Sequence, residues 1–175
     1  RTRQITLIGL MTAITCILAP LSIPLPFSPV PISLTNLVIF ISVFILGMKD
    51  ATISFLIYLL LGAVGLPVFA SFHAGLSVLA GPTGGYLIGF IFLALIQGFA
   101  MKYFDRKLIP TIIGMLIGMA VCYIFGTVWL AKLMSLSFKE GLFMGVIPYL
   151  PGDAVKIIIA VIVGPKLYAA TKKVR

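Results

Sequence analysis

The feature that most limits the fold of this chain is a succession of long apolar runs separated by short charged or proline-rich segments. Six runs, at 5–19, 32–48, 51–66, 83–101, 108–131 and 151–170, approach the length of about 20 residues that a membrane-spanning helix needs. Only 10% of the residues are charged, whereas a soluble domain carries about 25%. We therefore expect an all-α integral membrane protein, a single domain over residues 1–175 with six transmembrane helices.

The distribution of basic residues predicts how the chain is oriented. Six spans place both termini on one side, and ten of the 13 Lys and Arg residues flank the runs on that side. Two lie on the other side, and Lys156 lies inside the last run. The positive-inside rule then predicts that both termini are cytoplasmic. The outer segments become 20–31, 67–83 and 132–150, which are long and contain proline or glycine, so we expect them to cover a ligand pocket.

Several function classes are disfavoured by the same residues. The net charge of +9 does not indicate nucleic-acid binding, because the basic residues are scattered and are not interleaved with aromatic ones. A single histidine and two cysteines inside apolar runs offer no metal-ligand set and no catalytic triad. An enzyme using Asp153 and Lys156 as acid and base would lack a nucleophile and a second carboxylate, so we expect no enzymatic activity, no cofactor and no metal.

The last apolar run opens with Tyr149-Leu-Pro-Gly-Asp-Ala-Val-Lys156, which places an acid and a base where lipid-embedded protein is expected. On a helix Asp153 and Lys156 lie on one face, three residues apart. A charge near the middle of a membrane helix costs about 2.5–3.5 kcal/mol on insertion scales, so such residues face a cavity or a partner. We predict that this turn binds a small polar molecule. The alternative is a structural pair in which the two charges only neutralise each other.

The outer segment before the fourth run contains two further candidate stretches. Gly81-Pro-Thr-Gly-Gly-Tyr86 forces a turn and lets the backbone approach a neighbour closely. It predicts either a tight helix start or a ligand contact in which Tyr86 supplies a wall and a hydroxyl, with Thr83 beside it. Upstream lies Ser71-Phe-His-Ala-Gly75, from which Ser71, Phe72 and Gly75 are candidate ligand contacts. The histidine within it is interpreted as a solvated surface residue.

Gly9 and Ala13 form a small-xxx-small pair in the first run. This spacing lets another helix come close. Packing inside the same bundle is one explanation of the pair. Docking of a partner membrane protein onto the cytoplasmic half of the first helix is the other.

Three motifs together resemble the BioY family: Gly-Leu-Pro-Val-Phe-Ala (65–70), Gly-Pro-Thr-Gly-Gly-Tyr-Leu-Ile-Gly-Phe (81–90) and Pro-Gly-Asp-x-x-Lys (151–156). The proline-rich first outer segment with Pro-Ile-Ser-Leu (31–34) extends the resemblance over nearly the whole chain. BioY proteins are the biotin-specific substrate-binding (S) components of energy-coupling factor (ECF) transporters. The resemblance implies high-affinity binding of biotin from outside and its uptake across a prokaryotic plasma membrane by a multi-pass protein.

The same resemblance implies partners and roles. S components dock onto a transmembrane coupling (T) component that carries two ATPase subunits, and ATP is hydrolysed by those subunits. Gly9 and Ala13 match the docking position, although Ala is usual where this chain has Gly9. Asp153 would accept from the ureido N–H groups of biotin, and Lys156 would meet either the ureido oxygen or the carboxylate. An S component for another water-soluble vitamin and a standalone secondary vitamin transporter are the alternatives.

Overall fold

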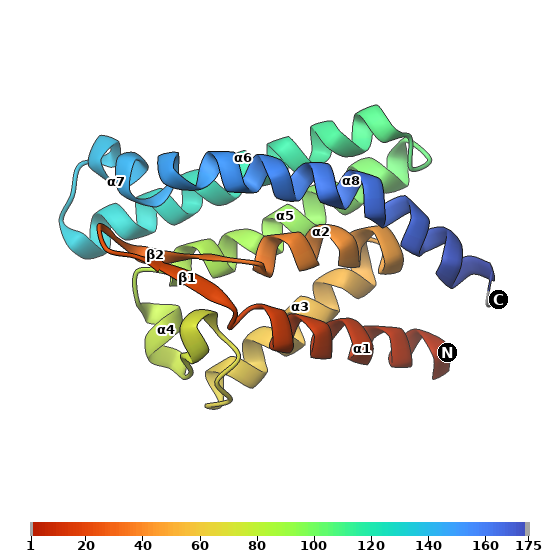
Figure 1. Cartoon of the computed structure of the whole chain (residues 1–175), viewed down its shortest axis with the longest axis horizontal. Helices are drawn as coiled ribbons and strands as arrows, with labels where there is room; N and C mark the ends of the chain where they lie inside the picture. Colours follow the sequence, from red (N-terminus) through yellow and green to blue (C-terminus); the bar gives the residue numbers. More distant parts are fainter. Residues whose placement is uncertain (1, 174–175) are drawn as a thin grey trace.

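The computed structural model describes residues 2–173, and Figure 1 shows a long bundle of helices. The elements are, in order, α1 (Thr2–Leu18), β1 (Ser22–Leu25), β2 (Ser28–Ser33), α2 (Thr35–Leu46), α3 (Met48–Ala63), the short 3₁₀ helix η1 (Ala70–Phe72), α4 (Leu76–Ala80), α5 (Gly84–Tyr103), α6 (Leu108–Met134), α7 (Phe138–Gly145), the 3₁₀ helix η2 (Ile147–Tyr149) and α8 (Leu150–Lys173).

The six predicted apolar runs fall on α1, α2, α3, α5, α6 and α8. By length and composition, three helical segments of the described chain can cross a membrane: α5, α6 and the stretch Phe138–Lys173 that ends in α8. The helices α1 and α2 are apolar but shorter, and α2 has 12 residues. Since a helix rises about 1.5 Å per residue, α2 alone covers less than the hydrocarbon thickness. The chain is mostly helical, with three segments among residues 2–173 that are long and apolar enough to cross a membrane, while the count of six spans stays a prediction.

The break between the second and third helices differs from the expected one. The predicted runs 32–48 and 51–66 put a short polar turn at Lys49 and Asp50, but both residues lie in the first turn of α3. The chain instead breaks at Gly47, whose φ of 82° is readily adopted by glycine and rarely by other residues. Asp50 then lies at the positive end of the helix dipole of α3, where a carboxylate is stabilised.

The first outer segment is not helical, as its prolines predict, but it is also not a loop. It forms an antiparallel hairpin in which Ser22 pairs with Ser33 and Leu25 with Ser28. The expectation of an all-α fold is therefore wrong for this segment. A two-stranded sheet tolerates Pro24 and Pro29 because each strand has a free edge that requires no N–H donor.

The other two outer segments also contain short helices, α4 and α7. Helix α7 starts with a capping box, in which the Ser137 hydroxyl accepts from the Glu140 N–H and the Glu140 carboxylate accepts from the Ser137 N–H at 2.7 Å. The hairpin, α4 and α7 all lie at the end of the bundle opposite the two termini (Figure 1).

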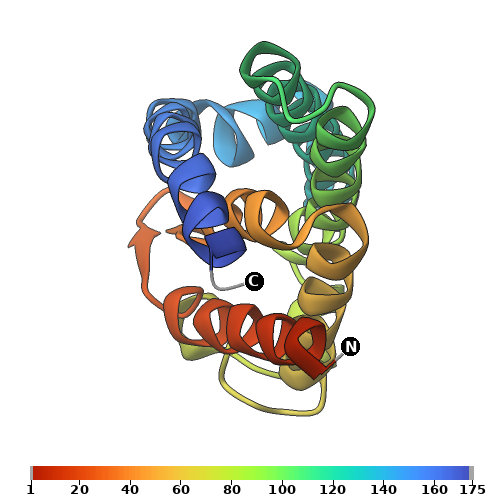
Figure 2. The same ribbon diagram turned by 90° about the vertical axis from the view of Figure 1, so that its right-hand side faces the viewer.

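Helices α5 and α6 form the most closely packed pair of the bundle. A Cβ atom added at Gly89 of α5 would lie 2.9 Å from the Cys122 Sγ, and one added at Gly118 of α6 would lie 3.1 Å from the Leu93 Cα. Glycine at these positions therefore allows the two backbones to approach. Helix α2 lies at the centre of the bundle and packs against α1, α3, α5 and α8 (Figure 2). This central position brings the start of α2 next to the start of α8.

Candidate functional site

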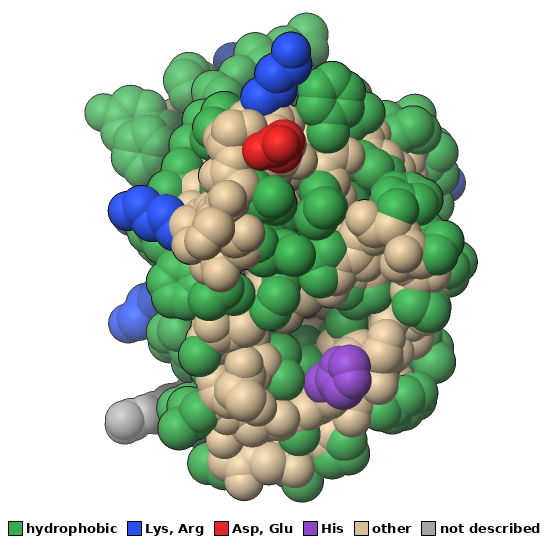
Figure 3. Space-filling view, turned by 90° about the vertical axis from the view of Figure 1, so that its left-hand side faces the viewer, with side chains coloured by type: hydrophobic (Ala, Val, Ile, Leu, Met, Phe, Trp, Pro, Cys, Tyr) green, Lys and Arg blue, Asp and Glu red, His purple; other side chains and the backbone are tan. Residues whose placement is uncertain are grey.

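A cavity of about 440 Å³ lies beneath the hairpin at the end opposite the termini. Figure 3 shows this end, with a hollow beside the histidine side chain, and His73 is one of the lining residues. Much of the lining is apolar and includes Phe69, Leu87, Phe90 and Met119. The polar lining residues are Ser28, Ser33, Thr35, Asn36, Ser71, His73, Ser77, Thr83, Tyr86, Tyr123, Tyr149, Asp153 and Lys156. A mostly apolar cavity with a few convergent polar groups is typical of small-molecule sites.

Asp153 and Lys156 form an ion pair in the first turns of α8, with 3.0 Å between the Lys156 Nζ and the Asp153 Oδ1. Helix α8 starts at Leu150, and Pro151 fits its first turn because the N–H that proline lacks has no helical acceptor there. Both charged residues are buried, and the Lys156 and Asp153 side chains are 10% and 9% exposed. The predicted one-face arrangement is present, and the pair lines the cavity.

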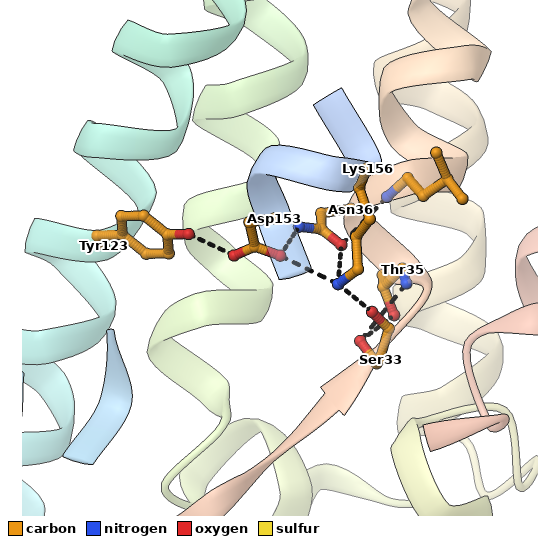
Figure 4. A network of polar contacts seen from close by, with 7 residues as sticks. Ser33, Thr35, Asn36, Tyr123, Asp153 and Lys156 are labelled. Atoms are coloured by element: carbon orange, nitrogen blue, oxygen red, sulfur yellow. Dashed lines mark hydrogen bonds and ion pairs between the residues drawn. The ribbon is translucent and has the colours of Figure 1, made fainter. Parts of the chain in front are cut away.

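Asn36, on the first turn of α2, joins the two charges (Figure 4). Its Nδ2 donates to the Asp153 Oδ1 at 2.7 Å, and its Oδ1 accepts from the Lys156 Nζ at 3.0 Å. The Lys156 Nζ also donates to the Ser33 carbonyl oxygen at 2.6 Å, and the Tyr123 hydroxyl donates to the Asp153 Oδ2. A buried ion pair is stable only when such bonds satisfy its remaining donors and acceptors.

The network has little unused bonding capacity, and this limits what a ligand can do there. The ammonium of Lys156 has three donors, and all three are used. The carboxylate of Asp153 accepts three hydrogen bonds and has room for about one more. The Asp153–Lys156 pair has no net charge. It suits an uncharged group that offers both N–H donors and an acceptor oxygen better than it suits a carboxylate.

Two tyrosines shape the wall of the cavity. The Tyr149 hydroxyl donates to the Val30 carbonyl and lies 2.8 Å from the Ser28 Oγ, so it fastens the hairpin to the segment before α8. Tyr86 was predicted to offer its ring and its hydroxyl. Tyr86 lines the cavity, and its buried hydroxyl lies against Gly145, another lining residue, where an added Cβ would lie 2.0 Å from the hydroxyl oxygen. Contact of this hydroxyl with a ligand stays a prediction.

The remaining predicted contacts divide into two groups. Ser71 and Thr83 line the cavity, and Ser71 is held by Ser22, whose Oγ accepts from the Ser71 N–H at 2.8 Å. Phe72 and Gly75 do not line it. Phe72 is 62% exposed, and Ser71 and Phe72 both adopt left-handed φ angles, 57° and 59°.

Sequence reasoning missed Asn36, Tyr123 and Tyr149. Asn36 carried a usable signal, since it is the one amide in a helix whose other polar residues are only the hydroxyls Thr35 and Ser42, and strongly polar side chains inside membrane helices are costly and often functional. Tyr123 carried none, because a tyrosine in an apolar run is equally consistent with simple packing. Tyr149 lies two residues before the last run, and no neighbouring residue indicated a role for it.

Gly9 and Ala13 lie on an exposed face of α1. A Cβ atom added at Gly9 would meet no atom within 4 Å. The side of α1 that packs in the bundle carries Met11, Thr12 and Thr15 instead. Packing inside the bundle therefore does not explain Gly9.

A profile of the BioY family matches residues 1–173. The chain belongs to the BioY family. This confirms the resemblance drawn from the motifs. A probable biotin transporter BioY from Pyrococcus horikoshii is 33% identical over 174 residues, covering 98% of this chain and 99% of the relative. The biotin transporter BioY of Thermotoga maritima is 35% identical over 165 residues, covering 94% and 95%. A crystal structure of the S component for biotin from an ECF-type ABC transporter matches with a TM-score of 0.88 and 31% identity, over 95% of this BioY chain and 90% of that chain.

Proposed function

We propose that this chain binds biotin in the outer cavity and takes part in biotin uptake as the S component of an ECF transporter. The observation that carries the proposal is the neutral Asp153–Lys156 pair at the wall of a largely apolar cavity. Membership of the BioY family supports the same ligand. The chain is a binding and transport component and not an enzyme.

Biotin has a polar part that matches the Asp153–Lys156 pair and an apolar part that matches the cavity wall. The ureido ring carries two N–H donors and one carbonyl acceptor. Asp153 can accept from an N–H group, and Lys156 can donate to the ureido oxygen in exchange for its bond to the Ser33 carbonyl. The thiophane ring and the methylene chain are apolar and fit the wall formed by Phe69, Leu87 and Phe90.

The neutral pair also suggests where the carboxylate of biotin lies. A carboxylate next to Asp153 would meet a like charge at close range, because Lys156 is already shared by Asp153 and Asn36. We therefore place the ureido ring at the pair. The valerate chain extends toward Ser71 and His73, which are exposed at the cavity mouth.

The partners follow from the same proposal. The chain lies in a plasma membrane as a multi-pass protein of six spans, with both termini in the cytoplasm. It docks through Gly9 and Ala13 onto a T component that carries two ATPase subunits, and those subunits hydrolyse ATP. The outward-facing, unobstructed Gly9 supports this docking face.

Titration calorimetry on the protein purified in detergent tests the ligand. Biotin and biotin methyl ester are expected to bind, because the ester keeps the ureido ring. Desthiobiotin keeps the ureido group without the thiophane and is expected to bind more weakly, and thiamine is expected not to bind. Binding of another vitamin in place of biotin would overturn the ligand assignment. Ion-driven uptake by vesicles that hold this chain alone would favour a secondary transporter.

A further inference from the structure

The end of the bundle that carries the termini contains two adjacent cavities, of about 440 and 530 Å³. The first lies between α1, α2, α3 and α8, and the second lies between α1, the α2–α3 junction and the α5–α6 turn. The two share Gln4, Leu46 and Asp50. Among residues 2–173, none that lines either of these cavities also lines the outer cavity.

The lining of the two cavities, taken together, contains more basic than acidic residues. Its charged members are Arg3, Lys49, Lys102, Arg106 and Lys172, against Asp50 and Asp105, so five positive and two negative charges give a net charge of +3. Within residues 2–173 the Asp153–Lys156 pair is the one salt bridge of the structure, so none of these five bases has a carboxylate partner there. Asp50 is instead held by the Gln4 amide, whose Nε2 donates to it at 2.6 Å.

Arg3 and Arg106 are each held by a backbone carbonyl and keep unused N–H donors. Arg3 donates to the Thr171 carbonyl and so bridges α1 and α8. Arg106 donates to the Phe44 carbonyl at 2.6 Å, and its guanidinium lies 3.8 Å from the centre of the Tyr168 ring. A guanidinium has five N–H donors, so both can still bind oxygen anions.

The surroundings of the first cavity match a lipid. Its walls are helices whose outer faces carry exposed apolar side chains, such as Ile5 and Leu10 on α1 and Ile158 and Ile162 on α8. Basic pockets between transmembrane helices on the cytoplasmic side bind anionic headgroups. We propose that these cavities bind the phosphate headgroup of an anionic phospholipid, with its acyl chains along the adjoining apolar helix faces. The proposal depends on membrane residence with the termini in the cytoplasm, as proposed above, and not on biotin binding.

Native mass spectrometry of the full chain, titrated with phosphatidylglycerol or phosphatidylcholine, tests this site. The wild type is expected to bind phosphatidylglycerol more tightly than phosphatidylcholine. The double variant Lys49→Gln/Lys172→Gln leaves the Arg3 bridge intact and is expected to weaken that binding about 30-fold, at about fivefold for each base. The matched control Lys132→Gln/Lys139→Gln removes the same charge at the opposite end and is expected to leave the affinity unchanged.

Three results would overturn the proposal. Equal affinity for phosphatidylcholine would show that the charge of the lipid is not recognised. Equal weakening in the control variant would assign the effect to net charge alone. Displacement of phosphatidylglycerol by millimolar inorganic phosphate would identify a site for soluble anions instead of lipid.

Discussion

Replacing Asn36 with leucine tests the polar network most sharply, since leucine has the same number and branching of side-chain heavy atoms and no polar atom. The change removes the donor to Asp153 and the acceptor of Lys156, bonds of 2.7 and 3.0 Å. A hydrogen bond to a charged group contributes about 1.5–3 kcal/mol. Without these two bonds Asp153 and Lys156 are no longer held in place. The free energy of biotin binding is expected to become less favourable by about 3 kcal/mol, which raises the Kd about 100-fold.

The assay is titration calorimetry, with thermal unfolding measured on the same samples. Gln97→Met is the matched control, because Gln97 is also a fully buried amide but lies outside the cavity, where its Nε2 donates to the Phe40 carbonyl at 3.1 Å. Both variants are expected to lower the Tm, and only Asn36→Leu is expected to weaken binding. A Kd for Asn36→Leu within threefold of the wild type would refute the role given to this amide.

Asp153→Ala and Lys156→Ala are each expected to abolish measurable biotin binding in calorimetry while the protein stays soluble in detergent, and unchanged affinity in both would remove the pair from the site. Gly145→Ala would place a Cβ 2.0 Å from the Tyr86 hydroxyl oxygen and is expected to destabilise the fold by about 1–3 kcal/mol in thermal unfolding. Adding Tyr86→Phe removes that oxygen and is expected to recover most of the loss, so a double variant no more stable than Gly145→Ala would contradict the packing described. Gly9→Leu is expected to keep biotin affinity and to weaken co-purification with a T component, and normal assembly would exclude this docking face.

The sequence predicts the helices of this chain far better than its connections. A long apolar run has few alternatives to a helix in a membrane, because every backbone polar group must be bonded internally. The proline-rich segment could be excluded from helices, but its pairing into a hairpin depends on Ser22 meeting Ser33, which no local pattern encodes. The helix break at Gly47 was missed because the charges next to it are the more conspicuous feature.

The candidate site was predictable where its residues lie close together in sequence. Asp153 and Lys156 share one helix turn, so their joint position follows from helix geometry. Asn36 lies 117 residues from Asp153, and only the packing of α2 against α8 brings them together. The direction of the Phe72 side chain could not be predicted even though its neighbours in sequence are known. Ser71 and Phe72 both adopt left-handed φ angles, which non-glycine residues seldom adopt.

A crystal structure of this chain with biotin tests the central claim most directly. The account predicts the ureido ring at the Asp153–Lys156 pair, with an N–H donated to the Asp153 carboxylate and the ureido oxygen bonded to the Lys156 Nζ. The valerate carboxylate is predicted at the mouth near Ser71 and His73. Biotin bound in the reverse direction, with its carboxylate on Lys156, would contradict the argument from the neutral pair, and biotin outside this cavity would contradict the assignment of the site.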